Sequence, residues 1–236
     1  MNFRMKLLGF SLLAMGLMVG QRAEAQRLEG EELPPDAELG RLTVKEAFTD
    51  TEPQAEDDDK HGKPPVEFVP TVPVLVDGVL YSPEELEKHG IKVVRFLLDE
   101  ESEAMGTLRG FTNAASLQEF LVKQGRMPTD EPQSPRAASC PSYFYEHWYY
   151  GGNWFNMHAG SAYPWLGSWN NRISSVSTTC ASWTVLYSLP FYVNQQLWIG
   201  RYTNVPELGR YGYWRWWWGW KWRSWNDNAM SVAVFW

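Results

Sequence analysis

The segment SWNNRISS, residues 168–175, recurs 56 positions later as SWNDNAMS, residues 224–231. Upstream of it the same pattern repeats at a shift of 42 positions, which pairs Tyr145 with Tyr187, Pro164 with Pro206, Leu166 with Leu208 and Gly167 with Gly209. The two shifts differ because the second copy carries an insertion, Arg210 to Arg223. A consistent internal repeat with one insertion indicates a duplicated structural unit.

Each copy contains three short stretches typical of β-strands, separated by Gly, Pro and Asn. The expected strands are residues 142–148, 153–157 and 174–178 in the first copy and 182–187, 196–202 and 231–235 in the second. Duplicated strand units of this kind predict a mainly β protein with a two-sheet sandwich at its C-terminal end.

Two motifs in each copy resemble motifs of the βγ-crystallin family. Tyr145 is followed seven positions later by Gly152, as in the folded hairpin of that family, where the chain turns with positive φ. In the second copy Asn194 stands at the glycine position, and Asn tolerates this conformation next best. Residues 170–175 fit the family's calcium motif, and residues 226–231 fit it except at Met230. The resemblance covers residues 140–236 and implies a two-motif Greek-key sandwich.

The resemblance also implies calcium sites that each combine both motifs. The candidate ligands are the side chains of Asn171, Ser174 and Asp227 and the backbone carbonyls of Glu146, Arg172, Ser188 and Asn228. A thioether is a poor calcium ligand, so Met230 predicts that one of the two sites is weak or absent. We expect one calcium ion of modest affinity, because Asp227 is the only charged side-chain ligand. The alternative is that the motif serines only tie down the hairpins and the Asn pairs only form turns.

The insertion RYGYWRWWWGWKWR, residues 210–223, is rich in Trp and in basic residues. On a single strand, the side chains of Trp214, Trp216, Trp218, Trp220 and Trp222 would share one face, and those of Arg215, Trp217, Lys221 and Arg223 the other. Gly219 could instead form the bend of a hairpin. Grouped Trp and cations favour a surface that contacts a glycan, a membrane or a protein. The alternative is a hairpin that only caps the sandwich core.

The N-terminal part of the chain has a different composition. Residues 1–25 have the pattern of a signal peptide that ends in Ala23-Glu24-Ala25, which predicts a secreted protein, extracellular or periplasmic. Residues 26–70 are acidic and proline-rich, and we expect them to be unstructured.

Residues 71–126 are predicted to form a small α+β module. The expected elements are a strand at 73–76, a helix from Pro83 to Gly90, strands at 91–98 and 107–111 joined by a turn at 100–105, and a helix at 114–123. Residues 127–139 are expected to be a linker to the domain at 140–236. In an exported chain, the two cysteines, Cys140 and Cys180, are expected to form a disulfide, and the alternative is two free thiols.

No catalytic pattern is present, including H-E-x-x-H, and we expect a binding protein rather than an enzyme. No transmembrane segment and no nucleic-acid partner is expected. Three functions remain open: a calcium-binding module of a bacterial envelope or extracellular matrix, a proteinase inhibitor like the secreted bacterial metalloproteinase inhibitors built on one βγ-crystallin domain, and a module that binds glycans or membrane surfaces through the Trp-rich insertion.

Overall fold

The computed structural model describes residues 38–40, 42–49, 71–131, 139–216 and 220–236 of the chain. The predicted signal peptide, most of the predicted unstructured segment, residues 132–138 of the predicted linker and residues 217–219 lie outside the described residues. Among the described residues, no helix has the length and apolar character that crossing a bilayer requires.

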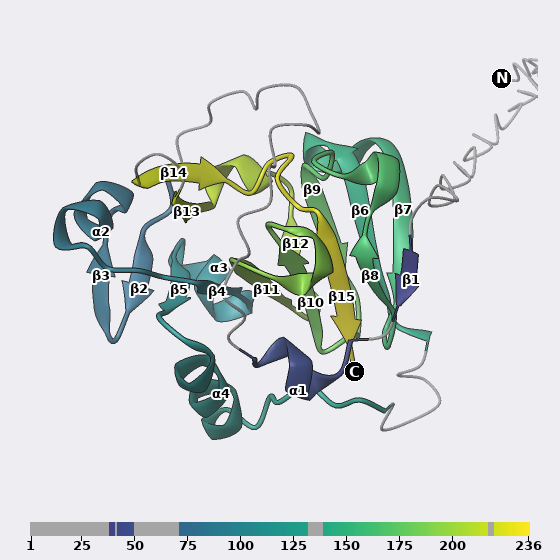
Figure 1. Cartoon of the computed structure of the whole chain (residues 1–236), viewed down its shortest axis with the longest axis horizontal. Helices are drawn as coiled ribbons and strands as arrows, with labels where there is room; N and C mark the ends of the chain where they lie inside the picture. Colours follow the sequence, from purple (N-terminus) through teal and green to yellow (C-terminus); the bar gives the residue numbers. More distant parts are fainter. Residues whose placement is uncertain (1–37, 41, 50–70, 132–138, 217–219) are drawn as a thin grey trace, which may run out of the picture.

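The two sequence copies form equivalent sets of four strands (Figure 1). The first set is β6 (Pro141–His147), β7 (Gly151–His158), β8 (Ala162–Trp165) and β9 (Ser175–Thr178). The second set is β10 (Trp183–Tyr187), β11 (Gln196–Gly200), β12 (Asn204–Val205) and β15 (Ser231–Phe235). Short 3₁₀ turns lie between them: η3 (Trp148–Tyr150), η4 (Gly167–Trp169), η5 (Pro190–Tyr192) and η6 (Leu208–Arg210).

The copies exchange their third strands. One sheet has the order β12-β9-β6-β7, and the larger sheet contains β8-β15-β10-β11, so each copy gives its third strand to the other copy's sheet. This exchange makes a two-motif Greek-key sandwich, and the predicted fold class is confirmed. The third strands β8 and β12 were not predicted, because Pro164 and Pro206 lie in or next to them and proline is depleted in strands.

Aromatic side chains fill the space between the two sheets. Phe144 and Phe155 stack with ring centroids 4.7 Å apart, and Trp169 lies edge-on to Phe155 at 4.8 Å. Trp169 and Trp225, which occupy equivalent positions in the two copies, are both fully buried. The repeated Ser-Trp-Asn segment is therefore first of all a core feature of the sandwich.

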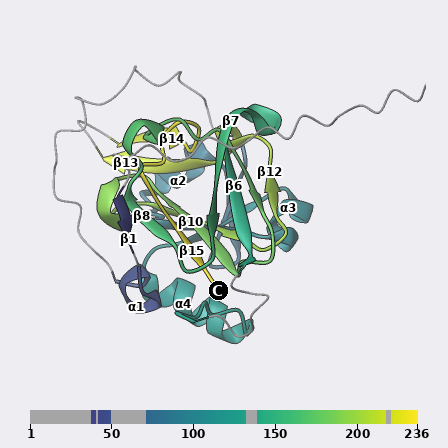
Figure 2. The same cartoon turned by 90° about the vertical axis from the view of Figure 1, so that its right-hand side faces the viewer.

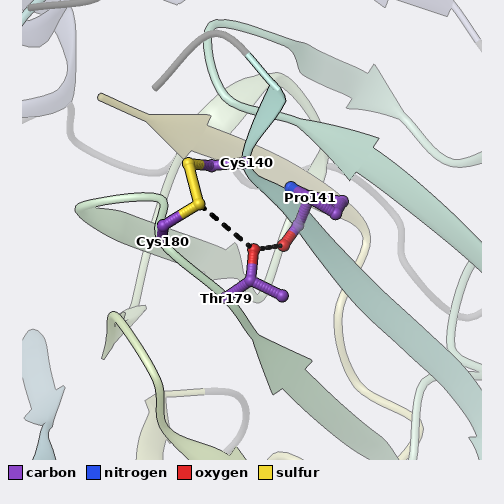
Figure 3. Close-up of a disulfide and its surroundings, with 4 residues drawn as sticks. All are labelled: Cys140, Pro141, Thr179 and Cys180. Carbon is purple, nitrogen blue, oxygen red and sulfur yellow. Dashed lines mark hydrogen bonds between the residues drawn. A yellow bond between two sulfur atoms is a disulfide. The ribbon is translucent and has the colours of Figure 1, made fainter. Parts of the chain in front are cut away.

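The predicted disulfide joins Cys140 and Cys180 (Figure 3). The Cα atoms lie 5.0 Å apart, which is within the range that a disulfide spans. The adjacent Thr179 hydroxyl donates to the Pro141 carbonyl at 2.5 Å. The disulfide therefore fastens the start of β6 to the segment between β9 and β10.

The α+β module continues the larger sheet. Its elements are β2 (Val74–Val76), β3 (Val79–Tyr81), α2 (Pro83–His89), β4 (Arg95–Leu98), α3 (Glu100–Met105), β5 (Leu108–Phe111) and α4 (Ala114–Lys123). β4 pairs in parallel with β11, with Gln196 opposite Arg95, so that the sheet has nine strands in the order β1-β8-β15-β10-β11-β4-β5-β2-β3.

Two elements of the module differ from the prediction. The strand expected at 91–98 begins only at Arg95, because the Ile91 amide donates to Leu86 O at 3.0 Å and completes the C-terminal cap of α2. The turn expected at 100–105 is the helix α3. Asp99 caps its N-terminus by accepting from Ser102 N at 2.9 Å, and Gly106 ends it with φ 63°.

Part of the acidic segment is ordered, contrary to the expectation for that part. β1 (Glu38–Gly40) pairs with β8, and α1 (Val44–Ala47) begins with a capping box between Thr43 and Glu46. Phe48 packs on Trp198 at 5.2 Å. The apolar residues of this part pack on the outer face of the larger sheet. This burial offsets the loss of chain entropy on ordering, which the acidic composition did not lead us to expect.

The insertion forms a two-stranded hairpin of β13 (Gly212–Trp216) and β14 (Trp220–Ser224). In both views it lies at the opposite end of the molecule from α1 and α4 (Figures 1 and 2). Its base is tied to the core, because Tyr213 is fully buried and packs on Trp225 at 4.6 Å.

Candidate cation site

Both folded hairpins have the predicted backbone. Gly152 has φ 75° and Asn194 has φ 71°, so Asn does take the glycine position in the second copy. The last serine of each motif fastens its hairpin. Ser175 Oγ donates to His147 O at 2.6 Å and accepts from Tyr150 N at 3.1 Å.

The second copy repeats this fastening at the related residues. Ser231 Oγ donates to Leu189 O at 2.7 Å and accepts from Tyr192 N at 3.1 Å. The structural role that the sequence left open for these two serines is therefore present in both copies.

The two Asn/Asp-rich turns cross each other. Asp227 N donates to Ile173 O, and in the related bond Asn171 N donates to Ala229 O, both at 3.0 Å. Asp227 and Asn171 both adopt the left-handed conformation, with φ 52° and 56°. This crossing joins the second position of each motif to the fourth position of the other, which is followed directly by the fifth position.

At one crossing the structure joins the only carboxylate of the motifs to their only fifth-position hydroxyl. Ser174 Oγ donates to Asp227 Oδ1 at 2.9 Å, and Asn226 Nδ2 donates to Asp227 Oδ2 at 2.8 Å. Ser174 is 4% exposed, whereas Asp227 is only partly buried. A charged and a neutral oxygen ligand held side by side suit a hard cation such as Ca²⁺.

The local environment disfavours the charge on Asp227. Burial raises the pKa of its carboxyl, while hydrogen bonds from Ser174 and Asn226 and the charge of His147 lower it, and the charge of Glu146 raises it. A bound cation would supply the positive charge that this partly desolvated carboxylate lacks.

Glu146 and Arg172 form an ion pair next to this carboxylate. Arg172 Nη2 lies 2.7 Å from Glu146 Oε1, and the Arg172 guanidinium stacks on the Trp169 ring at 4.9 Å. The hydrogen bond from Arg172 holds the pKa of Glu146 below its ordinary value. The charge of Glu146 raises the pKa of Asp227. Because Arg172 pairs with Glu146, it offsets part of the negative potential of the site.

Replacing Arg172 by glutamine is expected to raise the calcium affinity by about tenfold, because affinity in such sites follows the charge of the ligand set. Calorimetric titration measures it. Glu146→Gln is the matched control and should lower the affinity instead. Equal affinities of wild type and Arg172→Gln would show that the ion pair does not tune the site.

The other crossing lacks a hydroxyl. Asn171 lies beside Ala229, and the next residue, Met230, stands where the first copy has Ser174. Ser188 and Asn228 were predicted to contribute their backbone carbonyl oxygens, and their side chains make other contacts. Ser188 Oγ contacts Gln195 Oε1 at 3.3 Å, and Asn228 Nδ2 donates to Ser224 O and Asn226 O. We therefore expect the single strong site at Asp227.

The double variant Asn171→Asp, Met230→Ser restores the missing carboxylate and hydroxyl and is expected to bind a second calcium ion. The measured quantity is the stoichiometry in calorimetry, which should rise from one ion to two. Asn171→Asp alone is the control, since it adds charge without the hydroxyl. A stoichiometry of one for the double variant would contradict the equivalence of the two crossings.

The described residues contain no group of three or more His, Cys, Asp or Glu side chains that could hold a metal ion. A cation at this site would thus rely on Asp227, Ser174 and backbone carbonyls, with Glu146 the nearest further carboxylate. Oxygen-only sites with many neutral ligands fit calcium better than zinc or copper.

One contact at the site had no signal in the sequence. Trp148 Nε1 donates to Asn226 Oδ1 at 2.5 Å, which joins the first folded hairpin to the second motif. The related position in the second copy is Pro190, which has no such donor. His147 is likewise a neighbour of Asp227 that the motif did not indicate.

The predicted contact surface is a hairpin rather than a single strand. The backbone register places Trp214 opposite Trp222, Trp216 opposite Trp220 and Arg215 opposite Lys221. The positions of Trp217, Trp218 and Gly219 lie outside the described residues. Arg223 stands opposite Tyr213 at the base of the hairpin.

No protein-family model and no curated protein matches the chain. Solved structures of βγ-crystallins are similar to it over about 40% of its length. A βγ-crystallin from Ciona intestinalis is 17% identical, covers 40% of this chain and 98% of its own, and has a TM-score of 0.30. An archaeal βγ-crystallin is 16% identical, with 41% and 98% coverage and a TM-score of 0.31.

A βγ-crystallin domain from Clostridium beijerinckii is 21% identical, covers 40% of this chain and 95% of its own, and has a TM-score of 0.29. The resemblance predicted from the motifs is to this same family. With the strand exchange and the two folded hairpins described above, residues 140–236 form a βγ-crystallin-like domain.

Proposed function

We propose that this chain is a secreted calcium-binding module of a bacterial envelope or extracellular matrix, with its cation site at Asp227 and Ser174. The observation that carries the proposal is the 2.9 Å contact between the only carboxylate and the only fifth-position hydroxyl of the two motifs. A structural turn would need neither a partly buried carboxylate nor its pairing with that hydroxyl.

The neighbouring residues support a site of modest affinity. Asp227 supplies one negative charge, and the second carboxylate, Glu146, is engaged by Arg172. Sites with few charged ligands lie toward the weak end of the calcium range, which suits an extracellular module. The proposed secretion rests on the signal-peptide pattern of residues 1–25.

Calcium titration of the chain that begins at Gln26, followed by calorimetry, tests the proposal. We expect one ion, bound more tightly than magnesium, because a flexible set of neutral oxygens suits the larger cation. Ser174→Ala should weaken the binding strongly. The absence of heat at millimolar calcium would contradict the proposal and leave the motifs with the fastening role that Ser175 and Ser231 perform.

A further inference from the structure

The outer face of the four-stranded sheet carries a row of side chains that runs across all four strands. The register aligns one residue from each of β12, β9, β6 and β7: Asn204, Ser177, Tyr143 and Asn156. The next row in register is buried in the core and consists of Val205, Val176, Phe144 and Phe155. Because side chains alternate along a strand, the first row faces outward. Neighbouring strands lie about 4.8 Å apart, so this row is about 14 Å long.

Aromatic rings flank the row on the same face. The Tyr143 and Trp154 ring centroids lie 5.8 Å apart, and Tyr145 stands opposite Trp154 in the register. These three side chains are only partly buried, and both asparagines of the row are exposed. Ser177 Oγ donates to Asn204 Oδ1 at 2.7 Å, which fixes the orientation of that amide. β6 and β7, which carry the rings, stand toward the viewer in Figure 2.

The duplication supplies a comparison for this row on the larger sheet. The equivalent residues, aligned by the same register, are Ala162, Ala233, Val185 and Trp198. All four are buried, and they belong to one cluster with Ala47 of α1 and with Leu117 and Leu121 of α4. The same four positions are thus apolar where the chain covers its own sheet, and carry amide, hydroxyl and phenol groups where the face is open.

The open face is also uncharged, which an ordinary solvent-facing sheet is not expected to be. The outward positions of the four described strands that flank the row hold no Asp, Glu, Lys or Arg, in a chain with 21% charged residues. Glu146 lies at the irregularity of β6 next to this face, and Arg172 pairs with it. Charged side chains are the usual residues of a solvated surface, whereas aromatic rings there usually mark a contact. The charge of the face fits an uncharged partner.

We propose that this face, formed by Tyr143, Tyr145, Trp154, Asn156, Ser177 and Asn204, binds an uncharged polysaccharide chain. Aromatic rings pack on the apolar C–H faces of sugar rings, and amide and hydroxyl groups exchange hydrogen bonds with sugar hydroxyls. A row about 14 Å long suits several consecutive sugar units rather than one. This binding goes beyond the proposed function and does not depend on the cation site.

Native electrophoresis of the chain from Gln26 in gels that contain a polysaccharide tests the proposal. The uncharged polymers are hydroxyethyl cellulose and glycol chitin, and carboxymethyl cellulose has the glucan backbone of the first with carboxylates added. We expect the protein to be retarded in an uncharged gel, with an affinity at least about threefold higher than for carboxymethyl cellulose. The retardation should persist at high salt, because it does not rest on charge.

Two variants locate the face, and each removes groups that point to solvent. The double variant Asn156→Ala, Asn204→Ala should weaken the affinity about tenfold by removing both exposed amides. Trp154→Ala should weaken it by a similar factor by removing the largest ring. Near-ultraviolet circular dichroism checks that both variants keep the fold.

Two matched controls should bind as wild type does. Asn153→Ala removes an exposed amide of the same strand, at a position that alternates with Trp154 and shares the side of Phe155 and Met157. Phe191→Asn removes an aromatic side chain that is 61% exposed in the folded hairpin of the larger sheet. Its φ is 58°, a conformation that Asn tolerates.

Retardation in neither uncharged gel would overturn the proposal, as would wild-type affinity of both the Asn156, Asn204 variant and Trp154→Ala. Stronger retardation by carboxymethyl cellulose, or its loss at high salt, would overturn the choice of an uncharged ligand. Retention on phosphatidylcholine vesicles without retardation in the gels would assign the face to a membrane instead. Calcium calorimetry of the same proteins separates this proposal from the cation site: calcium binding without retardation rejects the polysaccharide and leaves the proposed function standing.

Discussion

Replacing Asp227 by asparagine is expected to lower the calcium affinity by at least about a hundredfold, because it removes the only charged side-chain ligand of the set. The change keeps the size of the side chain and an oxygen that can still accept from Ser174. The loss should therefore be electrostatic, with no loss of fold, and calorimetry together with near-ultraviolet circular dichroism measures both.

The matched control is Asn171→Ala at the related position of the other crossing, which should leave the affinity within about a factor of two if only one site is strong. Loss of binding in the control, or retention of it in Asp227→Asn, would place the cation elsewhere.

The calcium affinity is also expected to depend on pH. Calcium binds the deprotonated carboxylate, and burial raises the pKa of Asp227. As the pH falls through that raised pKa, protons compete with calcium, and they do so at a higher pH than at an ordinary Asp. Affinities measured between neutral and acidic pH should decline accordingly in wild type and much less in Asp227→Asn.

Removing the disulfide is the change with the largest expected effect on stability. The bond closes a loop with a sequence separation of 40, for which the chain-entropy model gives about 4 kcal/mol. The double variant Cys140→Ala, Cys180→Ala should lose roughly that much free energy of unfolding in a denaturant titration. Alanine is the suitable replacement because Cys140 is buried.

Reduction of wild type is the matching control and should lower its stability by a similar amount, while the double variant should not respond to the reductant. If the free energies of unfolding of wild type and the double variant differ by less than about 0.5 kcal/mol, the start of β6 is held to the segment between β9 and β10 without the disulfide.

The sandwich could be predicted because the repeat carries local signals that each have a physical cause. Gly152 and Asn194 mark the positions of positive φ, and the paired serines mark the points where each hairpin is fastened. Residues that are equivalent by the offset between the copies therefore make equivalent contacts in the structure. The third strands were not predicted because β8 contains Pro164 and because β12 has only two residues and is followed by Pro206.

The placement of the module could not be predicted in the same way. The parallel pairing of β4 with β11 joins residues about a hundred positions apart, and nothing in either short strand specifies that partner. The capping box at Thr43 and Glu46 was a readable helix signal, but the surrounding acidic composition masked it. The contact of Val44 N with Asp130 Oδ1 at 2.7 Å shows how distant residues order this segment.

At the candidate site, the motif identified Ser174 and Asp227 separately, and the crossing of the two turns brings them into contact. The sequence shows that Met230 weakens one of the two sites, and only the crossing of the two turns shows which site that is. The Arg172–Glu146 pair was invisible to the motif, because these residues were assigned through their carbonyl groups and the ion pair involves their side chains.

The most direct test of the cation site is a crystal structure of the chain from Gln26 grown with calcium, with anomalous difference density used to locate the ion. We expect one peak at about 2.3–2.6 Å from Asp227 Oδ1 and from the Ser174 hydroxyl oxygen, with no peak beside Asn171. A peak beside Asn171 alone, or no peak at saturating calcium, would contradict the site proposed for this protein.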